Sequence, residues 1–553
     1  MLMWSLGNES RWGTNIAKEY AYAKREDPSR PLIFSYPATV PSGTAGYDIW
    51  SEHYPKVDGD LKSPGVPKLN DEYGHVSCYN IETLKRDPGV RDFWGESLRL
   101  FWDNCFASEG CLGGAIWGSI DEVFMLPDSP VGYGEWGIVD GWRRPKPEYW
   151  LTKKAYSPIH IKGSPVANPG PGKPLTLPIQ NRFDHTDFNE LTIDWSVGLE
   201  YGTVTHFSLP PHAAGTLSIP ARAWQNGEVL NLKFYRPGRI LVDEFNLTLG
   251  RPAPVFPKVQ GPAPAVIADT NTLRVAGPDF TITFSRQTGL ITEGIFRGSK
   301  LLEGGPYLNL GAVSLPTWWL TKLSYSTTPD EAVVDISGRY MAVRGGEERG
   351  KTEFQVRIDG AGLITTHYTV FDLPEDASEV GVSYELSNDV DRLTWRRNSL
   401  WSVYPAEHIG RSQGVAMKLN GHTEKYRTQP AHPWAEDSNN YFLFGSNDVG
   451  ERGTNDFRSL KADVFYASCV FSGTNLRLRA ESEGTVAVRA GVRAGGKVIF
   501  SVDNLWGYPD LGWGNLAPPL GLPKSTTNSV RMRLTDNDDV PMTFENVVPE
   551  SAQ

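Results

Sequence analysis

Residues 4–10 read WSLGNES, an apolar strand-like segment followed by a glycine and then by polar residues that include Glu9. Residues 66–72, VPKLNDE, repeat this arrangement and end in Glu72. Polar side chains directly after a buried strand are typical of the C-terminal mouth of an α/β barrel, where such barrels build their active sites. The two segments therefore suggest both a fold and a site.

Around them, apolar strand-like segments alternate with helix-like segments through about residue 156. Strands are expected at residues 2–6, 31–34, 47–50, 66–69 and 112–117, and helices at residues 14–25 and 91–106. This alternation predicts part of a (β/α)₈ TIM barrel. A complete barrel has eight strands and roughly 250 residues, so the five predicted strands leave the first three unaccounted for.

Beyond the barrel segment the pattern becomes almost wholly β, with two proline-rich stretches at residues 164–174 and 251–265. Short alternating strands between turn signals predict an immunoglobulin-like β-sandwich and then a large β-sandwich. The expected domains are residues 1–156, the C-terminal part of the TIM barrel; residues 157–255, the immunoglobulin-like sandwich; and residues 263–551, the large sandwich.

The composition narrows the function classes. The 553 residues carry a net charge of −11 without a clustered basic face, which argues against nucleic-acid binding. We find no apolar run long enough for a membrane span and no signal peptide, so the compartment is left open between cytoplasm and periplasm. The four cysteines match neither a disulfide framework nor a zinc pattern, which predicts reduced thiols.

Glu9 and Glu72 would face each other across the mouth of one parallel barrel. Glycoside hydrolysis uses such a pair: one carboxylic acid protonates the leaving oxygen, and the other group, as a carboxylate, attacks the anomeric carbon. Acidic residues at strand ends are also common without any catalytic role. Position alone therefore leaves both interpretations open.

Three motifs resemble the glycoside hydrolase family 2 β-galactosidases. WSLGNES, followed by a helix and DPSRP at residues 27–31, is similar to the acid/base segment of that family. NDEYGH at residues 70–75 resembles the nucleophile segment, and GGAIWGSID at residues 113–121 resembles the last barrel strand. The family also continues with an immunoglobulin-like domain and a large β-sandwich, so the resemblance covers essentially the whole chain.

The resemblance implies roles for residues at the mouth of the barrel. Glu9 matches the acid/base and Glu72 the nucleophile, which implies a retaining double displacement. Asn8 matches a residue that hydrogen-bonds the sugar 2-hydroxyl, and Tyr54 a tyrosine beside the nucleophile. His75 matches a sugar-binding histidine, with a purely structural histidine as the alternative.

Two tryptophans complete the set. Trp117 matches a residue that lines the sugar pocket, where it would be a stacking floor, and core packing is the alternative. Trp513, in the sequence GWGN at residues 512–515, resembles a loop by which the last sandwich reaches the outer subsite.

The resemblance also implies Mg²⁺ or Na⁺, but the ligand sets are incomplete in this sequence. The magnesium site of the family combines the acid/base glutamate with two residues that would precede Met1, and Trp136 stands where the family has a sodium-binding asparagine. The acidic pair Asp121-Glu122 could hold a metal, but we favour a structural role. No residue is therefore predicted as a metal ligand.

The expected partner is a β-galactoside or oligosaccharide substrate. The same scaffold serves β-glucuronidases and β-mannosidases; Arg143-Arg144 could meet the carboxylate of a glucuronide, although a role in capping the end of the barrel fits that loop better. A further alternative is a non-catalytic carbohydrate-binding or assembly fragment, with residues 395–397 and 400–404 as its binding face; a scaffold role suits those residues better.

By this resemblance the chain starts at the fourth barrel strand. We expect a homo-oligomer, or a chain that needs the missing N-terminal portion. Alone, it is expected to fold its two C-terminal sandwiches, to leave the half-barrel unsettled and to show little activity.

Overall fold

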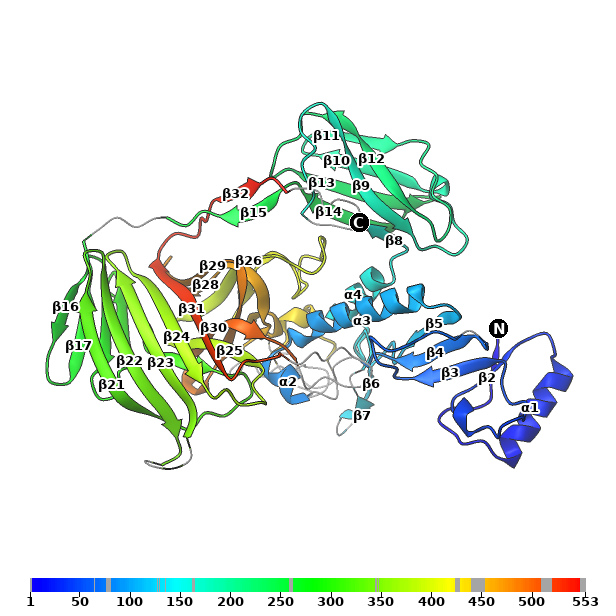
Figure 1. The fold of residues 1–553 in the computed structure, drawn as a ribbon, viewed down its shortest axis with the longest axis horizontal. Coiled ribbons are helices and arrows are strands. Elements are labelled where there is room, and N and C mark those ends of the chain that lie inside the picture. Colours follow the sequence, from blue (N-terminus) through cyan, green and yellow to red (C-terminus); the bar gives the residue numbers. More distant parts are fainter. Residues whose placement is uncertain are drawn as a thin grey trace.

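The computed structural model describes residues 2–63, 65–75, 81–126, 128, 130–134, 136–161, 165–257, 262–343, 346, 348–422, 428–438, 453–508 and 520–547. Figure 1 shows three parts in chain order: an α/β segment in blue to cyan, a small β-sandwich in teal, and a large β-structure in green to red. None of the helices in these ranges has the length and apolarity that crossing a membrane requires.

The α/β segment is built on a parallel sheet of five strands in the order β1-β2-β3-β4-β5. They are β1 (Trp4–Ser5), β2 (Leu32–Phe34), β3 (Ile49–His53), β4 (Lys68–Tyr73) and β5 (Cys111–Ile116). The helices are α1 (Thr14–Glu26), α2 (Ile81–Arg86), α3 (Val90–Ala107) and α4 (Pro147–Ala155). The five predicted parallel strands and both predicted helices are confirmed.

Helix α3 supplies most of the core of this segment. Trp94, Leu98, Phe101 and Cys105 recur every three or four residues and are almost fully buried, so they form one face of the helix. That face packs on Tyr73 of β4, whose ring lies 4.3 Å from the ring of Phe101. By contrast, α1 contains no fully buried residue. The sheet is therefore anchored mainly from the β4–β5 side.

After β5 comes a hairpin that the sequence pattern does not indicate, formed by β6 (Glu122–Met125) and β7 (Pro130–Gly134). Its first strand, β6, contributes to the cavity described below. Of the cysteines, Cys105, Cys111 and Cys469 are free thiols, as predicted; Cys78 lies outside the described residues.

The small sandwich consists of two antiparallel sheets. One contains β8 (Ile159–Ile161), β9 (Lys173–Asn181) and β12 (Ala214–Arg222), and the other β10 (Thr192–Val197), β11 (Glu200–Val204), β13 (Val229–Arg236) and β14 (Ile240–Thr248). Alternate residues of both sheets point inward and are fully buried, such as Leu177 in β9 and Leu232 in β13. This is the predicted immunoglobulin-like architecture.

The large β-structure is a 16-stranded antiparallel sheet folded around one extensive apolar core. Its strands are β16 (Ala265–Ala268), β17 (Thr272–Ala276), β18 (Phe280–Ser285), β19 (Ile291–Phe296), β20 (Ser299–Asn309), β21 (Thr317–Thr327), β22 (Glu331–Met341), β23 (Glu348–Asp359), β24 (Leu363–Phe371), β25 (Glu379–Leu386), β26 (Val390–Arg397), β27 (Gln413–Met417), β28 (Lys461–Phe471), β29 (Arg477–Val492), β30 (Val498–Trp506) and β31 (Ser525–Thr535). A short helix, α6 (Asn455–Arg458), precedes β28, and β15 (Arg251–Pro254) pairs with β32 (Met542–Glu545) beside the sheet.

Helices α3 and α4 and the loop before α4 connect the three parts, and in Figure 1 both helices lie beneath the small sandwich. Lys154 of α4 forms a buried ion pair with Asp243 of the small sandwich, with 2.5 Å between Nζ and Oδ1. Arg144 pairs with Asp437 of the large β-structure at 2.8 Å. The α/β segment is thus held against both sandwiches by buried charges.

Candidate active site

Glu72 lies near the C-terminal end of β4, in register with His53 at the end of β3. Its side chain is buried, and the Tyr54 hydroxyl donates a short hydrogen bond to Oε1. The backbone N–H of Tyr54 also donates to the Glu72 carbonyl oxygen at 2.8 Å. The hydroxyl thus offers a hydrogen-bond donor to the carboxylate oxygen, which suits a carboxylate that attacks a substrate.

Glu9 follows β1, and Gly7 provides the turn between them with a φ of +125°, which side chains rarely tolerate. Glu9 itself has a φ of +45° and Tyr54 a φ of +50°. Left-handed backbone at non-glycine residues is uncommon and concentrates at functional sites. The Glu9 side chain is about half exposed, so a substrate can reach it.

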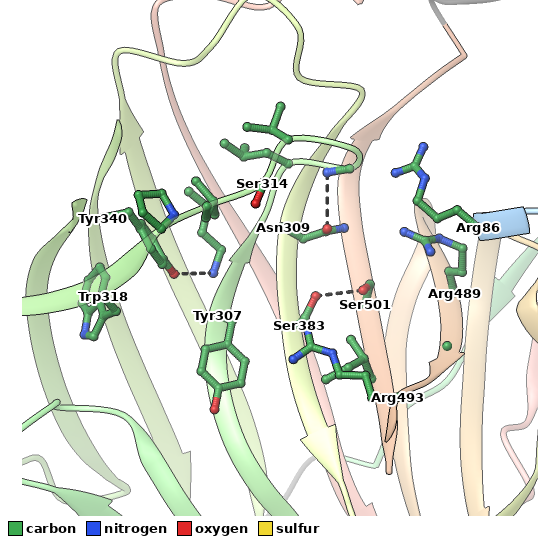
Figure 2. Close-up of a pocket in the computed structure, with 18 of the residues that line it drawn as sticks. Arg86, Tyr307, Asn309, Ser314, Trp318, Tyr340, Ser383, Arg489, Arg493 and Ser501 are labelled. Carbon is green, nitrogen blue, oxygen red and sulfur yellow. Dashed lines mark hydrogen bonds between the residues drawn. The ribbon is translucent and has the colours of Figure 1, made fainter. Parts of the chain in front are cut away.

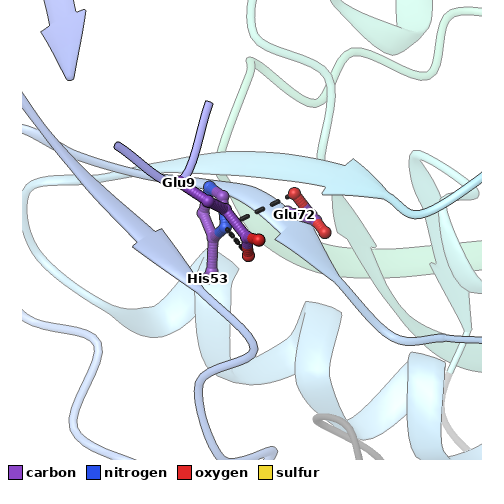
Figure 3. A group of neighbouring side chains, drawn as sticks. All are labelled: Glu9, His53 and Glu72. Carbon is purple, nitrogen blue, oxygen red and sulfur yellow. Dashed lines mark hydrogen bonds and ion pairs between the residues drawn. The ribbon is translucent and has the colours of Figure 1, made fainter. Parts of the chain in front are cut away.

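His53 contacts both glutamates, as the dashed lines in Figure 3 show. Its Nδ1 is 3.3 Å from Oε1 of Glu9 and 3.3 Å from Oε2 of Glu72. One nitrogen of the ring and one oxygen of each carboxylate lie within 4.8 Å of one another. The parallel sheet therefore brings together two carboxylates that are 63 positions apart in the chain.

The charge of His53 depends on its neighbours. Burial lowers its pKa, but the hydrogen bond and the charge of Asp71, together with the carboxylates of Glu9 and Glu72, raise it by more, so the pKa lies above its usual value. Tyr36 is the other side chain here whose pKa is raised, by burial, by the charge of Glu9 and by its hydrogen bond to Glu9. The mouth of the sheet is therefore rich in negative charge that an imidazolium offsets.

A second layer supports Tyr54. The His75 ring stacks on the Tyr54 ring at 4.8 Å with an interplanar angle of 5°, and the Trp136 ring lies 5.6 Å from His75. Burial lowers the pKa of His75 to about 4, so the ring is neutral at neutral pH. His75, predicted as a sugar ligand, is buried beneath the tyrosine, which fits the structural alternative at least as well.

Trp117 follows β5, and its backbone N–H donates a hydrogen bond to the backbone carbonyl oxygen of Tyr73 in β4. The half-buried side chain lines a cavity of about 860 Å³, together with Asp71, Trp136, Trp142 and Arg143. A cavity of this size accommodates small ligands such as sugars. The predicted stacking role of Trp117 is thus compatible with its position.

Of the other predicted substrate residues, Asn8 is exposed next to Glu9, and its carbonyl accepts a hydrogen bond from Ser10 Oγ. Trp513 lies outside the described residues. Asp121 is buried and pairs with Lys146 at 2.6 Å, whereas Glu122 is exposed, so the acidic pair does not converge on one point. The favoured structural role of Asp121 agrees with this ion pair.

The two arginines after the hairpin differ. Arg144 is buried between Asp140 and Asp437, which agrees with the capping role, whereas Arg143 is exposed at the cavity of Trp117. The proposed binding face around Trp395 packs inward instead. Trp395 is buried, and Arg397 reaches Asp92 of α3 at 3.2 Å, which favours the scaffold role.

The metals implied by the resemblance do not fit the described residues. The sequence shows no residue near Glu9 that could bind a metal together with it. In the structure, His53 and Glu72 lie close enough to Glu9 to be considered as ligands. Mg²⁺ prefers oxygen ligands in octahedral geometry, whereas one of the three ligand atoms that this group offers is an imidazole nitrogen. The indole of Trp136 offers no oxygen for Na⁺. The chemistry of the site is therefore derived from the side chains alone.

Sequence reasoning missed three residues of this site: His53, Asp71 and Tyr36. Asp71 accepts a hydrogen bond from Ser51 Oγ at 2.6 Å, and its Oδ1 lies 3.6 Å from His53 Nε2. All three follow the core of a strand or lie at its C-terminal end. This position in the sequence could have identified them, because polar residues at the C-terminal ends of parallel strands lie together at the mouth of the barrel.

Paired carboxylates that face one substrate are the arrangement that most glycoside hydrolases use. Residues 1–75 match the family model of glycosyl hydrolases family 2, TIM barrel domain. This match confirms the resemblance seen in the sequence over that region.

The similar proteins are β-galactosidases. One from Enterobacter cloacae is 40% identical over 491 residues, which cover 75% of this chain and 45% of that protein. β-Galactosidase 2 of Enterobacter cloacae is 21% identical over 495 residues, with the same coverage of 75% and 45%. The β-galactosidase of Pectobacterium atrosepticum is 25% identical over 275 residues, 42% of this chain and 25% of that protein. The chain thus spans less than half the length of these relatives.

Among solved structures, one match is the apo structure of β-glucuronidase 3 from Bacteroides uniformis. The matched region covers 66% of this chain and 48% of the glucuronidase chain. Its identity is 14% and its TM-score 0.22, which is too low to bear on the fold or the activity.

Proposed function

We propose that this glycoside hydrolase cleaves terminal β-D-galactosides with retention of configuration, with Glu72 as nucleophile and Glu9 as acid/base. The observation that carries the proposal is the close approach of the two carboxylates, whose nearest oxygens lie within 4.8 Å and which both contact His53 Nδ1. Retaining enzymes hold their carboxyl groups about 5–5.5 Å apart, and inverting enzymes about 6.5–9.5 Å. The β-galactosidase relatives support the choice of sugar.

In the first step, Glu72 attacks the anomeric carbon while Glu9 gives its proton to the leaving oxygen. The bond to the aglycone breaks and a glycosyl–Glu72 ester forms. In the second step, Glu9 takes a proton from water, the water oxygen attacks the anomeric carbon, and Glu72 leaves as a carboxylate. The Tyr54 hydroxyl stabilises the charge on Glu72 before attack and after departure.

The test is hydrolysis of chromogenic β-galactosides by the purified chain, alone and mixed with the N-terminal region of a related β-galactosidase. Glu72→Gln should lower kcat/KM by at least about 10³-fold for every aglycone, because no covalent intermediate can form. Glu9→Gln should cost about 10²–10⁴-fold with a poor leaving group and much less with an acidic phenol, which departs without a proton. Glu19→Gln, at an exposed position on α1, is the control.

The stereochemistry is tested separately by NMR detection of the first anomer released. The β-anomer agrees with double displacement, and the α-anomer would exclude it. Equal effects of Glu9→Gln on good and poor leaving groups would remove Glu9 from the acid/base role.

β-Glucuronide hydrolysis is a second candidate because one cation, Arg143, is exposed at the cavity that Trp117 lines. Matched 4-nitrophenyl β-glucuronide and β-galactoside substrates distinguish the two activities. A preference for the glucuronide that Arg143→Gln abolishes would replace the β-galactosidase proposal.

A further inference from the structure

A second cavity, of about 610 Å³, lies in the large β-structure on a different set of strands from the paired glutamates. Its described lining comes from strands β20, β21, β22, β25, β29 and β30, the loop after β20, Arg493 after β29, and Arg86 of α2. In Figure 2, Trp318 and Tyr340 lie on one side of the cavity, and Arg86 and Arg489 on the other. Neither the family match nor the proposed chemistry uses these residues.

The floor of the cavity is a row of polar side chains across four neighbouring strands. Tyr307 pairs with Ser383, Ser383 with Ser501, and Ser501 with Arg489 in the strand register. Ser383 and Ser501 are buried, and their hydroxyls lie 2.8 Å apart. Because side chains alternate between the faces of a sheet, the intervening residues, such as Val382, Phe500 and Val488, point into the apolar core.

Polar residues on a buried sheet face carry a desolvation cost that an apolar row would avoid. Serine and tyrosine hydroxyls can both donate and accept hydrogen bonds, which matches the hydroxyl groups of a sugar. Asn309, two residues further along β20, also lines the cavity, but its amide Nδ2 already donates to Glu379 and Asp503. The row is therefore suited to a polyhydroxylated ligand.

The cavity is also cationic. Arg86, Arg489 and Arg493 line it, and its described lining includes no aspartate or glutamate. Glu379 pairs with Arg86 at 3.1 Å and with Arg489 at 2.8 Å, and so compensates for one of the three charges. Arg493 is exposed at the cavity.

The other acids nearby offset part of this charge, and they include Asp87, whose charge acts on Arg489. Glu385, on the same face of β25, pairs with Lys497 at 2.7 Å. Asp503 is fully buried, and burial together with the charge of Glu379 raises its pKa well above the usual value. An anionic group on a ligand would therefore meet a net positive charge in the cavity.

We propose that this cavity binds an acidic sugar, a saccharide ring that carries a carboxylate. Arg493 and Arg489 meet the carboxylate, the row of Tyr307, Ser383 and Ser501 meets the ring hydroxyls, and the indole of Trp318 offers an apolar surface to the ring. The site is separate from the paired glutamates, so the proposal does not depend on the function proposed for them.

Gly491 gives a sharp test. A Cβ at this position would meet nothing within 4 Å, and Gly491 lies two residues from Arg489 on the same face of β29. Gly491→Leu therefore fills the cavity without a clash in the sheet. Gly13→Leu, where a Cβ also meets nothing within 4 Å, is the matched control.

Binding of D-galacturonate, D-galactose and inorganic phosphate to the full chain is measured by titration calorimetry. We expect galacturonate to bind at least about tenfold more tightly than galactose or phosphate, a difference of about 1.4 kcal/mol. Gly491→Leu and Arg493→Gln should each weaken galacturonate binding about tenfold or more, and Gly13→Leu and Glu72→Gln should leave it unchanged. Arg493 is exposed, so its variant provides a test even if Gly491→Leu fails to fold.

Three outcomes overturn the proposal. One is that galacturonate does not bind at millimolar concentrations. Another is that galactose or phosphate binds as tightly, because recognition of both the ring and the charge would then be absent. The third is that Glu72→Gln abolishes binding while Gly491→Leu and Arg493→Gln do not, which would place the ligand at the paired glutamates.

Discussion

At the scale of single residues, His53 contacts both glutamates of the candidate active site and Asp71 beside them. Three carboxylates surround it, and without a positive charge the approach of Glu9 and Glu72 would be repulsive. An imidazolium between them reduces this repulsion and keeps both acids within reach of one anomeric carbon. We interpret His53 as a positioning residue, because it acts through the two glutamates.

The raised pKa of His53 predicts a pH-dependent stability. A group whose pKa is raised on folding stabilises the folded state fully below its unfolded pKa, about 6.5, and loses this contribution as the pH rises through the folded pKa. The difference in Tm between the natural chain and His53→Gln should therefore be largest near about pH 6 and shrink towards about pH 9.

Thermal unfolding monitored by circular dichroism across this pH range checks the prediction. His185→Gln, at an exposed histidine of the small sandwich, should show no such trend. A constant difference for His53→Gln at every pH would mean that the charge of His53 contributes nothing.

Tyr54 is the other residue whose role can be isolated. Tyr54→Phe removes the hydroxyl that donates to Glu72 and keeps the ring that stacks on His75. A hydrogen bond to a charged group contributes about 1.5–3 kcal/mol, so kcat/KM should fall about 10–100-fold. Steady-state kinetics on a β-galactoside measure the loss, with Tyr22→Phe at an exposed site on α1 as control. An unchanged rate would mean that Glu72 works without this donor.

At the scale of elements, α3 determines whether the parallel sheet is stable. Phe101→Ala should destabilise the α/β segment by about 3–5 kcal/mol, because the fully buried ring packs on Tyr73 of β4. Urea unfolding followed by hydrogen exchange of the β4 amides localises the effect. Tyr22→Ala, at a 59% exposed aromatic of α1, should change stability by less than about 0.5 kcal/mol. Similar losses for both variants would contradict the unequal packing of the two helices.

At the scale of the whole molecule, buried ion pairs hold the α/β segment against the sandwiches. Arg144→Met leaves Asp437 buried without that partner. The substitution should therefore lower the free energy of unfolding by about 3–5 kcal/mol. Arg143→Met replaces the exposed residue next to Arg144 in the chain. It should lower the free energy of unfolding by less than about 0.5 kcal/mol. Chemical denaturation of both variants is the measurement, and equal stability would show that the interface does not need this charge pair.

The sequence by itself determined the fold class, the five parallel strands, both long helices of the α/β segment and the family of that segment. The fold class, strands and helices follow from local patterns, because apolar periodicity and strand-end polar residues are properties of neighbouring positions. The family followed instead from the resemblance of three motifs. Glu9 and Glu72 were likewise found from motifs, and their catalytic roles stay predictions until the variants are assayed.

Only the tertiary structure decided which side chains share a site. His53 has no distinguishing motif, and its position between two carboxylates arises because β1, β3 and β4 lie in one parallel sheet. Likewise, Tyr307, Ser383, Ser501 and Arg489 form one row through strand pairing between segments far apart in the chain. Register and distant contacts depend on the packing of the whole chain, so no local window of sequence contains them.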